Sequence, residues 1–390
     1  MNVQQVPPTE ASGLKEWIGL KRSDSRCRPF AVIMKSADRC NYFCDYCYVE
    51  DHCALPIMPI ATALAAIEKV LAYVGPRRKV NFIWHGGEPL LAGRRFYQQI
   101  ADFCRQYHDN KVEHCIQTNG ALATEQFLDF CKETGFTVSL SLDGPEDITD
   151  AHRHTATGAA TFQKTMRTLA GVRARGMAPG CVCVLHQGNA GRVEDLYRFF
   201  STNRINVRIN PVVKSGRAAT AYNNLAITPA EFGTAMCRLF DLWFDDDYRI
   251  QLEPLYTILG NMIAPTVWGC DYHGKCLESI IAVNPDGSVY PCGRFAGMKN
   301  FRLGNILQDS NLDAMFAREP FVSLNGRGPE TVEGCAACDF VNICNSGCMV
   351  TAYMARQRFT DPDYYCEGRR MLFRHIANRL KRHLENIQEE

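Results

Sequence analysis

The sequence predicts an α/β fold in which a partial (β/α)6 TIM-like barrel is followed by a small cysteine-rich domain. Between residues 30 and 247, short apolar runs alternate with amphipathic segments. Most of these runs are apolar on both faces, as buried parallel strands are. The alternation is repeated six times, which is typical of a parallel sheet with right-handed crossovers. After Gly269, turn residues and eight cysteines replace the helical periodicity, which indicates a second, smaller domain.

The predicted strands are rich in valine, isoleucine and phenylalanine. They are Phe30–Met34, Val80–Trp84, Val112–Gln117, Thr137–Leu142, Cys181–His186 and Ile205–Asn210. A helix is predicted from near Pro59 to Gly75, because apolar residues recur on one face of this segment. Another helix is predicted to begin at Thr228, where a capping box with Glu231 is combined with proline at the first helical position.

These changes of pattern divide the chain into four parts. They are residues 1–29, an N-terminal extension; 30–247, the barrel; 248–368, the cysteine-rich domain; and 369–390, a C-terminal helix. The cysteine-rich domain has short strands such as Ser279–Val283. The last helix has a single apolar stripe, which favours packing against the protein over binding to a membrane or a nucleic acid.

The composition indicates an ordinary globular protein of the cytoplasm. The net charge is +1, from 43 basic and 42 acidic residues, so the charge gives no sign of binding to nucleic acid or to a membrane. No apolar run approaches the roughly 20 residues that span a bilayer. Residues 1–16 lack the apolar stretch of a signal peptide. In a reducing compartment, 19 cysteines point to metal binding or catalysis instead of disulfides.

Three cysteines lie on the loop that follows the first predicted strand: Cys40, Cys44 and Cys47. Three thiolates on one loop can hold three irons of a cubane cluster, which leaves the fourth iron open to chelate a substrate. A cluster that serves only electron transfer usually has four cysteines. A zinc site is the alternative, in which His52 or Cys53 would be the fourth ligand.

The Cys-x3-Cys-x2-Cys spacing, with Tyr46 before the last cysteine, resembles the signature of the radical S-adenosylmethionine (radical SAM) superfamily. The segments after the next predicted strands agree with it, and they fall at the carboxyl ends of strands, where barrel enzymes have their active sites. Gly86 to Pro89 resemble the GGEP segment that binds the methionine amino group, and Arg153 is the expected partner of the methionine carboxylate. The cofactor contacts implied by the resemblance are Tyr46, Gly86, Gly87, Glu88, Pro89, Gln117, Asn119, Ser141, Asp143 and Arg153.

The resemblance also implies the chemistry. Cys40, Cys44 and Cys47 would hold the catalytic cluster, and the reduced cluster would pass an electron to the sulfonium of S-adenosylmethionine. The resulting 5′-deoxyadenosyl radical would abstract a hydrogen atom from an unactivated C–H bond, while the protein supplies placement and exclusion of water. A reductase, or a protein of the flavodoxin or ferredoxin type, is the expected electron donor.

The eight C-terminal cysteines have spacings that resemble the SPASM domain of radical enzymes, which holds two auxiliary [4Fe–4S] clusters. The resemblance implies one ligand set of Cys270, Cys276, Cys292 and Cys348, and another of Cys335, Cys338, Cys344 and Cys366. Full ligation suits both clusters for moving electrons, and three clusters are expected in all. Zinc is the alternative for the Cys-x2-Cys pair, and a non-catalytic iron–sulfur or zinc scaffold is the alternative for the whole chain.

SPASM enzymes mostly modify peptides or proteins, and two groups of them resemble this chain. Anaerobic sulfatase maturases oxidise cysteine or serine to formylglycine, and an aspartate follows their counterpart of Cys292. Here that position is Gly293, which has no side chain to accept a proton, so another carboxylate such as Glu253 would have to substitute. The Tyr-Pro-Cys-Gly-Arg-Phe stretch is more similar to enzymes that join an aromatic ring to a β-carbon. The expected reaction is therefore an intramolecular crosslink in a ribosomally made precursor peptide, above all a C–C cyclophane, with formylglycine or thioether formation as alternatives.

Overall fold

The computed structural model describes residues 29–49, 56–107, 112–263 and 267–389. The predicted N-terminal extension, apart from Pro29, lies outside these residues, and so do the alternative zinc ligands His52 and Cys53. Within the described ranges, none of the helices is both long enough and apolar enough to cross a membrane.

One sheet of ten strands runs through the molecule, in the order β10-β9-β8-β1-β2-β3-β4-β5-β6-β7. Strands β1 to β7 are parallel neighbours. Their bounds are β1 Phe30–Ala37, β2 Val80–Gly86, β3 Val112–Thr118, β4 Thr137–Ser141, β5 Gly180–Leu185, β6 Asn206–Pro211 and β7 Leu252–Glu253. The six predicted strands are confirmed as β1 to β6, and the short strand β7 was not predicted.

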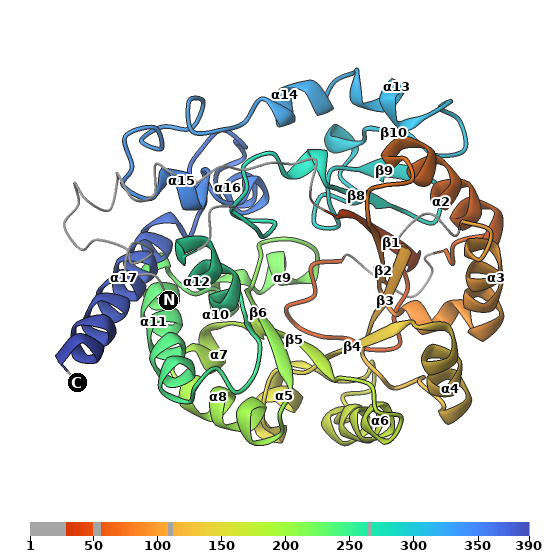
Figure 1. The fold of residues 1–390 in the computed structure, drawn as a ribbon. Helices are drawn as coiled ribbons and strands as arrows, with labels where there is room; N and C mark the ends of the chain where they lie inside the picture. The colour runs from red at the N-terminus through yellow and green to blue at the C-terminus, as the bar shows by residue number, and fades with distance from the viewer. Residues whose placement is uncertain (1–28, 50–55, 108–111, 264–266, 390) are drawn as a thin grey trace.

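Helices cover the outer side of the arc that the barrel strands form, among them α2 Ile60–Val74, α3 Arg94–Cys104, α4 Glu125–Thr134, α6 Phe162–Ala174 and α8 Val193–Thr202 (Figure 1). The other helices of this part are α5 Glu146–His152, α7 Gln187–Ala190, α9 Arg217–Thr220, α10 Tyr222–Leu225, α11 Pro229–Asp245 and α12 Leu255–Ile263. Of these, α9 lies inside the arc, where Ala218 N donates a 3.1 Å hydrogen bond to Cys47 O. As predicted, α2 ends at Gly75 and α11 begins with a capping box between Thr228 and Glu231. The predicted α/β fold with a partial barrel is confirmed.

Strand β2 has one fully buried face and one partly buried face. On β2, Val80, Phe82 and Trp84 are fully buried, and Trp84 packs edge-on against Tyr97 of α3 with 5.6 Å between ring centroids. The alternate residues of β2, up to His85, are only partly buried. The partly buried face of β2 carries Asn81, Ile83 and His85, so this strand is not apolar on both faces, as most of the strands are expected to be.

The cysteine-rich domain continues the same sheet. Strand β8 (Ile280–Val283) pairs in parallel with β1, and β9 (Ser288–Tyr290) and β10 (Gly304–Asn305) follow in antiparallel order. The hairpin between β8 and β9 turns at Gly287, whose φ of +80° favours glycine. The first barrel strand thus anchors the second domain. Its helices are α13 Leu312–Phe316, α14 Phe321–Asn325, α15 Val341–Cys344 and α16 Met349–Arg356.

The C-terminal helix, α17, runs from Cys366 to Glu389 and so begins three residues earlier than predicted. It packs against α11, and the two backbones approach each other closely at Gly368. A Cβ atom there would lie 2.1 Å from the carbonyl oxygen of Pro229 and 2.9 Å from the nitrogen of Gly233. Glycine is required for this contact, which fixes the position of the cysteine at the start of the helix.

Candidate functional site

The loop with three cysteines leaves β1 and lies inside the arc of strands in Figure 1. Local hydrogen bonds shape it, from Tyr42 N to Cys40 Sγ (3.4 Å) and from Cys47 N to Cys44 O (3.3 Å). Burial raises the pKa of Cys40 to about 12 and that of Cys44 to about 11. The thiols therefore stay protonated at neutral pH until a metal displaces their protons.

Two histidines hold this loop at Asp45, between the second and third cysteines. The Asp45 carboxylate is 2.9 Å from His152 Nδ1 and 3.0 Å from His154 Nε2. The backbone adds hydrogen bonds from Phe43 N to His154 O and from Asp45 N to His152 O. The sequence analysis missed this arrangement, because residues more than 100 positions apart carry no local signal for a contact.

The Gly86-Gly87 turn fits tightly under the start of the cysteine loop. Cβ atoms at these two glycines would lie 2.3 Å from the carbonyl oxygen of Ala37 and 2.2 Å from that of Arg39, respectively. Gly87 N also donates a 2.7 Å hydrogen bond to Ala37 O. Only glycine permits this approach, so the turn at the end of β2 and the cysteine loop form one unit.

Glu88, the next residue, is fully buried and joins the ends of β2 and β3. Its carboxylate accepts hydrogen bonds from Thr118 Oγ1 (2.6 Å), Asn119 N (2.9 Å) and Leu90 N (2.9 Å). Burial raises the pKa of Glu88, and these donors counteract part of the rise. The side chain of Glu88 thus connects two loops of the site within the protein.

Tyr46, Asp143 and Arg153 form a buried network. The Tyr46 hydroxyl donates to Asp143 Oδ2, and Arg153 Nη1 donates to the Tyr46 hydroxyl at 2.9 Å. The other oxygen of Asp143 accepts from Val184 N at 2.9 Å. The structure therefore brings three of the predicted cofactor residues together, and both oxygens of Asp143 are used inside the protein.

The remaining predicted contacts lie at the same end of the barrel. Asn119 Nδ2 donates to Asn41 Oδ1 at 2.8 Å and lies 3.8 Å from Cys40 Sγ. Gln117 Nε2 donates to Ser141 Oγ at 3.1 Å, between the ends of β3 and β4. All the sequence-predicted residues of the barrel thus gather around the cysteine loop, at the carboxyl ends of the strands.

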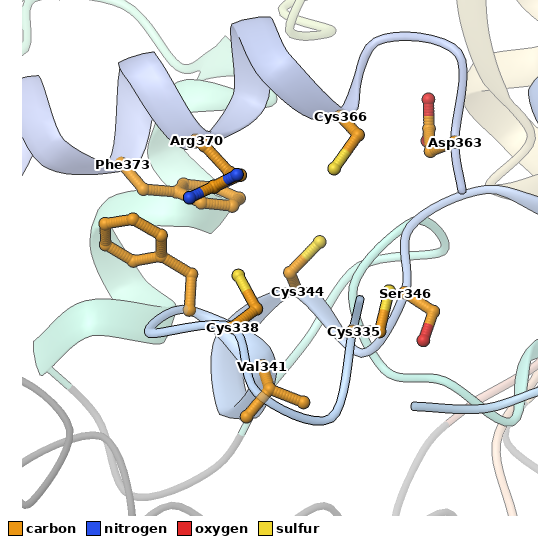
Figure 2. Close-up of a pocket in the computed structure, with 10 residues that line it drawn as sticks. Cys335, Cys338, Val341, Cys344, Ser346, Asp363, Cys366, Arg370 and Phe373 are labelled. Atoms are coloured by element: carbon orange, nitrogen blue, oxygen red, sulfur yellow. The ribbon is translucent and has the colours of Figure 1, made fainter. Parts of the chain in front are cut away.

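The eight cysteines of the second domain line two separate cavities. Cavity I is lined by Cys270, Cys276, Cys292 and Cys348, and cavity II by Cys335, Cys338, Cys344 and Cys366. Figure 2 shows the sulfur atoms of Cys338, Cys344 and Cys366 facing a shared space in cavity II. The structure therefore groups the cysteines in the two sets that the sequence resemblance implied.

Each cavity is lined by four thiols, which is the number of ligands that a four-iron cluster or a structural zinc ion takes. In the part of the chain that the structure describes, no three His, Cys, Asp or Glu side chains converge on a point where one metal ion would bind. Zinc needs four ligands at about 2.0–2.3 Å from one ion. The ligands of a four-iron cluster lie further apart, because each thiolate binds a different iron.

The residue after Cys292 faces the first barrel strand. A Cβ atom at Gly293 would lie 3.2 Å from Cγ2 of Ile33, which is a tight contact. Arg294 follows, close to cavity I. Burial raises the pKa of the Cys348 thiol to about 11, and Arg294 counteracts part of this rise. Cavity I therefore has the cation Arg294 beside it, and the residue between this cation and Cys292 is a glycine without a side chain.

Glu253, at the end of β7, has a carboxylate oxygen without a hydrogen-bond partner in the part of the chain that the structure describes. It lies in register with Arg208 of β6, while the adjacent Leu252 is in the core. Its Oε1 accepts a 3.1 Å hydrogen bond from Gln251 Nε2. Its Oε2 is buried and has no hydrogen-bond partner among the described residues. An unsatisfied buried acceptor of this kind suits a group that binds a hydrogen-bond donor of a ligand.

Two family models match the chain. The model of the radical SAM superfamily covers residues 34–200, and that of the iron–sulfur cluster-binding SPASM domain covers residues 270–339. The first range contains the cysteine loop, and the second contains three of the four cysteines of cavity I and two of the four of cavity II. Together they imply iron–sulfur clusters and S-adenosylmethionine as cofactors.

Curated relatives cover almost the whole chain. A cysteine-type anaerobic sulfatase-maturating enzyme of Clostridium perfringens is 27% identical over 92% of this chain and 100% of its own length. A serine-type enzyme of the same kind from Bacteroides thetaiotaomicron is 26% identical over 93% of each chain.

Solved structures that are similar to this chain also cover most of its length. The structure of native anSMEcpe with bound AdoMet has a TM-score of 0.80 and 25% identity, and the match covers 92% of this chain and 100% of that one. The same protein with bound AdoMet and Cp18Cys peptide has a TM-score of 0.79, with 25% identity over 92% of this chain and 99% of that one. Streptococcus suis SuiB bound to the precursor peptide SuiA shares the fold, with a TM-score of 0.65 and 15% identity over 87% of this chain and 76% of SuiB. The chain is therefore a radical SAM enzyme, built from a radical SAM domain joined to a SPASM domain.

Proposed function

We propose that this enzyme matures a ribosomally made precursor peptide by forming an intramolecular C–C crosslink between an aromatic ring and a β-carbon. The observation that carries the proposal is the residue after Cys292. A glycine stands there, its α-carbon packs toward Ile33, and the next residue is the cation Arg294. A sulfatase-type reaction needs a base for the hydroxyl or thiol of its substrate, whereas an attacking aromatic ring has no such proton to lose before it reacts.

We assign the cofactors to three sites. Cys40, Cys44 and Cys47 would hold the cluster that binds S-adenosylmethionine, and cavities I and II would each hold one auxiliary [4Fe–4S] cluster. When bound, S-adenosylmethionine and its cluster supply the radical that removes a hydrogen atom from the peptide. In this assignment, Arg153 and Asn119 orient the cofactor at the barrel mouth, and Tyr46 holds Arg153 in place.

The last step of the proposed reaction releases a proton from the ring, and we assign Glu253 as the residue that accepts it. A ring that has formed a bond to the β-carbon regains aromaticity when it loses an electron and a proton. Most carboxylates around the barrel mouth already have partners within the protein; these are Asp38, Asp45, Glu88 and Asp143. Glu253 has a buried oxygen with no partner in the described part of the chain, so we assign it as the proton acceptor.

Formylglycine formation is the second candidate, and the curated relatives favour it. Both relatives are named as sulfatase-maturating enzymes and cover at least 92% of this chain. In that reaction the substrate thiol or hydroxyl must lose its proton, and Glu253 would have to replace the missing aspartate. A thioether-forming maturase would need a peptide that carries a cysteine next to the oxidised carbon.

The test is anaerobic reconstitution followed by incubation with reductant, S-adenosylmethionine and candidate peptides. Reductant and an electron donor of the flavodoxin or ferredoxin type should both support the reaction. A peptide about 2 Da lighter, with fragmentation blocked between an aromatic residue and a neighbour, would support the crosslink, because two hydrogens are lost overall. A product that reacts with hydrazide reagents contains an aldehyde and would establish formylglycine instead.

A further inference from the structure

Arg369 lies between the two cysteine cavities of the second domain. It is in the first turn of α17, three residues after Cys366, and is only 3% exposed. Its guanidinium contacts two carboxylates, with 3.1 Å from Nη2 to Asp271 Oδ2 and 3.2 Å from Nε to Asp363 Oδ2. Its third nitrogen, Nη1, donates a 2.7 Å hydrogen bond to the Tyr272 hydroxyl.

Asp271 directly follows Cys270, a cysteine that lines cavity I. The Asp271 carboxylate thus lies beside this cysteine and is paired with Arg369.

Asp363 belongs to both cavities. It lines cavity II, where Figure 2 shows it beside Cys366. Its Oδ2 also accepts a 2.7 Å hydrogen bond from the backbone nitrogen of Cys348, a cysteine of cavity I. Its Oδ1 accepts from Tyr365 N at 2.8 Å, which fixes the turn that leads into α17.

A buried arginine between two carboxylates does not by itself explain this position. Ion groups of this kind can be replaced by apolar residues of similar volume with little loss of stability, so they are weak evidence for a stabilising role. The Asp271–Arg369–Asp363 bridge differs from such groups because both of its carboxylates are linked to cysteines of the cavities. Asp271 is the neighbour of Cys270 in the chain, and Asp363 accepts a hydrogen bond from the backbone nitrogen of Cys348. Groups that hold the ligands of a metal site orient the ligands and tune the metal.

We propose that Arg369 is a positioning residue shared by both auxiliary cluster sites, which holds the cysteine loops of cavities I and II in one frame and acts with its charge on both clusters. This inference rests on the proposed function, which assigns one cluster to each cavity. A cation shared by both sites would raise the reduction potentials of both clusters together, which suits two sites that pass one electron between them.

The test uses the full chain with Cys40, Cys44 and Cys47 replaced by alanine, so that only the auxiliary clusters remain after anaerobic reconstitution. Redox titration followed by electron paramagnetic resonance gives the midpoint potential of each cluster. In Arg369→Met, which keeps the aliphatic stem and removes the charge, we expect both potentials to move to more negative values, because a positive charge favours the reduced state. In Arg369→Lys, which keeps a positive charge at this position, we expect both potentials to lie close to those of the protein with Arg369.

Arg370→Met is the matched control, because Arg370 lines cavity II and does not line cavity I. We expect it to move the potential of one cluster only. The proposal is overturned if Arg369→Met moves one potential or neither, or if Arg369→Lys behaves like Arg369→Met.

If Arg369→Met does not fold, Asp271→Asn provides the test. A change in the midpoint potentials of both clusters supports the shared bridge, and a change in the potential of one cluster contradicts it.

These outcomes are separate from those of the proposed function, because the background variant cannot perform radical chemistry and no peptide is used. An iron content near eight per chain in the parent is expected for two four-iron clusters. A content near four would contradict the cluster assignment itself, and with it this proposal, whatever the peptide products of the intact enzyme are.

Discussion

Arg153 donates a 2.9 Å hydrogen bond to the hydroxyl of Tyr46, which lies 107 residues away in the cysteine loop. The same hydroxyl donates to Asp143, so one phenol links the loop after β1 to the loop after β4. All three side chains are buried. In a medium of low polarity, each member of such a network depends on the others for its hydrogen bonds.

Tyr46→Phe should therefore destabilise the protein. It leaves a buried carboxylate oxygen and a guanidinium nitrogen without their partner, which costs about 1–3 kcal/mol. Urea unfolding of the purified chain measures this loss. Tyr42→Phe is the control in the same loop, because the Tyr42 hydroxyl is buried with no hydrogen-bond partner among the described residues. Its removal should be neutral or stabilising, and equal losses in both variants would contradict the role of the network.

The sequence predicted the barrel well because its signals are local. Each strand is a short apolar run, and Gly75 and the Thr228 capping box mark helix ends through their own backbone chemistry. Strand β7 has two residues and no apolar run, so it gives no such signal. The pairing of β8 with β1 joins positions about 250 residues apart, which no periodicity can indicate.

The candidate site also has features that the sequence predicted and features that it did not. The spacing of the cysteines and the resemblance that it carries predicted which four line each cavity. The sequence did not predict the partners of these groups, such as the two histidines that hold Asp45 or the bridge through Arg369. Charged and polar residues are common on any surface, and only the fold decides which of them become buried together.

Gly368→Ala should destabilise the contact between α11 and α17. The added Cβ would lie 2.1 Å from the Pro229 carbonyl oxygen, and backbone atoms must shift to make room. Overpacking of this kind costs about 1–3 kcal/mol, which thermal unfolding detects as a lower Tm. Gly260→Ala, in α12, is the control because no atom lies within 4 Å of its added Cβ. There the substitution should be neutral or stabilise by up to about 1 kcal/mol, through higher helix propensity.

The stability of the protein should fall as the pH falls below about 6.5. Burial lowers the pKa of His114 to about 3, from 6.5 for an exposed histidine. Between these values the unfolded chain takes up a proton that the folded chain does not. The contribution of His114 is therefore complete above pH 6.5 and is lost below it, by up to about 1.4 kcal/mol per pH unit.

His114→Asn tests this relationship. Asparagine can still accept the hydrogen bond that Trp84 Nε1 donates to His114 Nδ1 at 3.3 Å, but it does not titrate. Urea unfolding at pH 7.5, 6.5 and 5.5 should show a shallower decline of the free energy of unfolding in the variant than in the parent. Parallel curves would mean that His114 takes up its proton in the folded state as well.

Removal of one cysteine from cavity II should empty that cavity alone. Cys338→Ala takes away one of the four thiols that line cavity II, and we expect the cluster assigned to this cavity to be held less firmly by the remaining three. We expect the anaerobically reconstituted chain to lose about four of about twelve irons. Cys131→Ala is the control: this cysteine is on the buried face of α4 and lines neither cavity, so the full iron content should remain. A loss of about eight irons in Cys338→Ala would show that cavity I depends on cavity II for its cluster, as the contact between Asp363 and Cys348 allows.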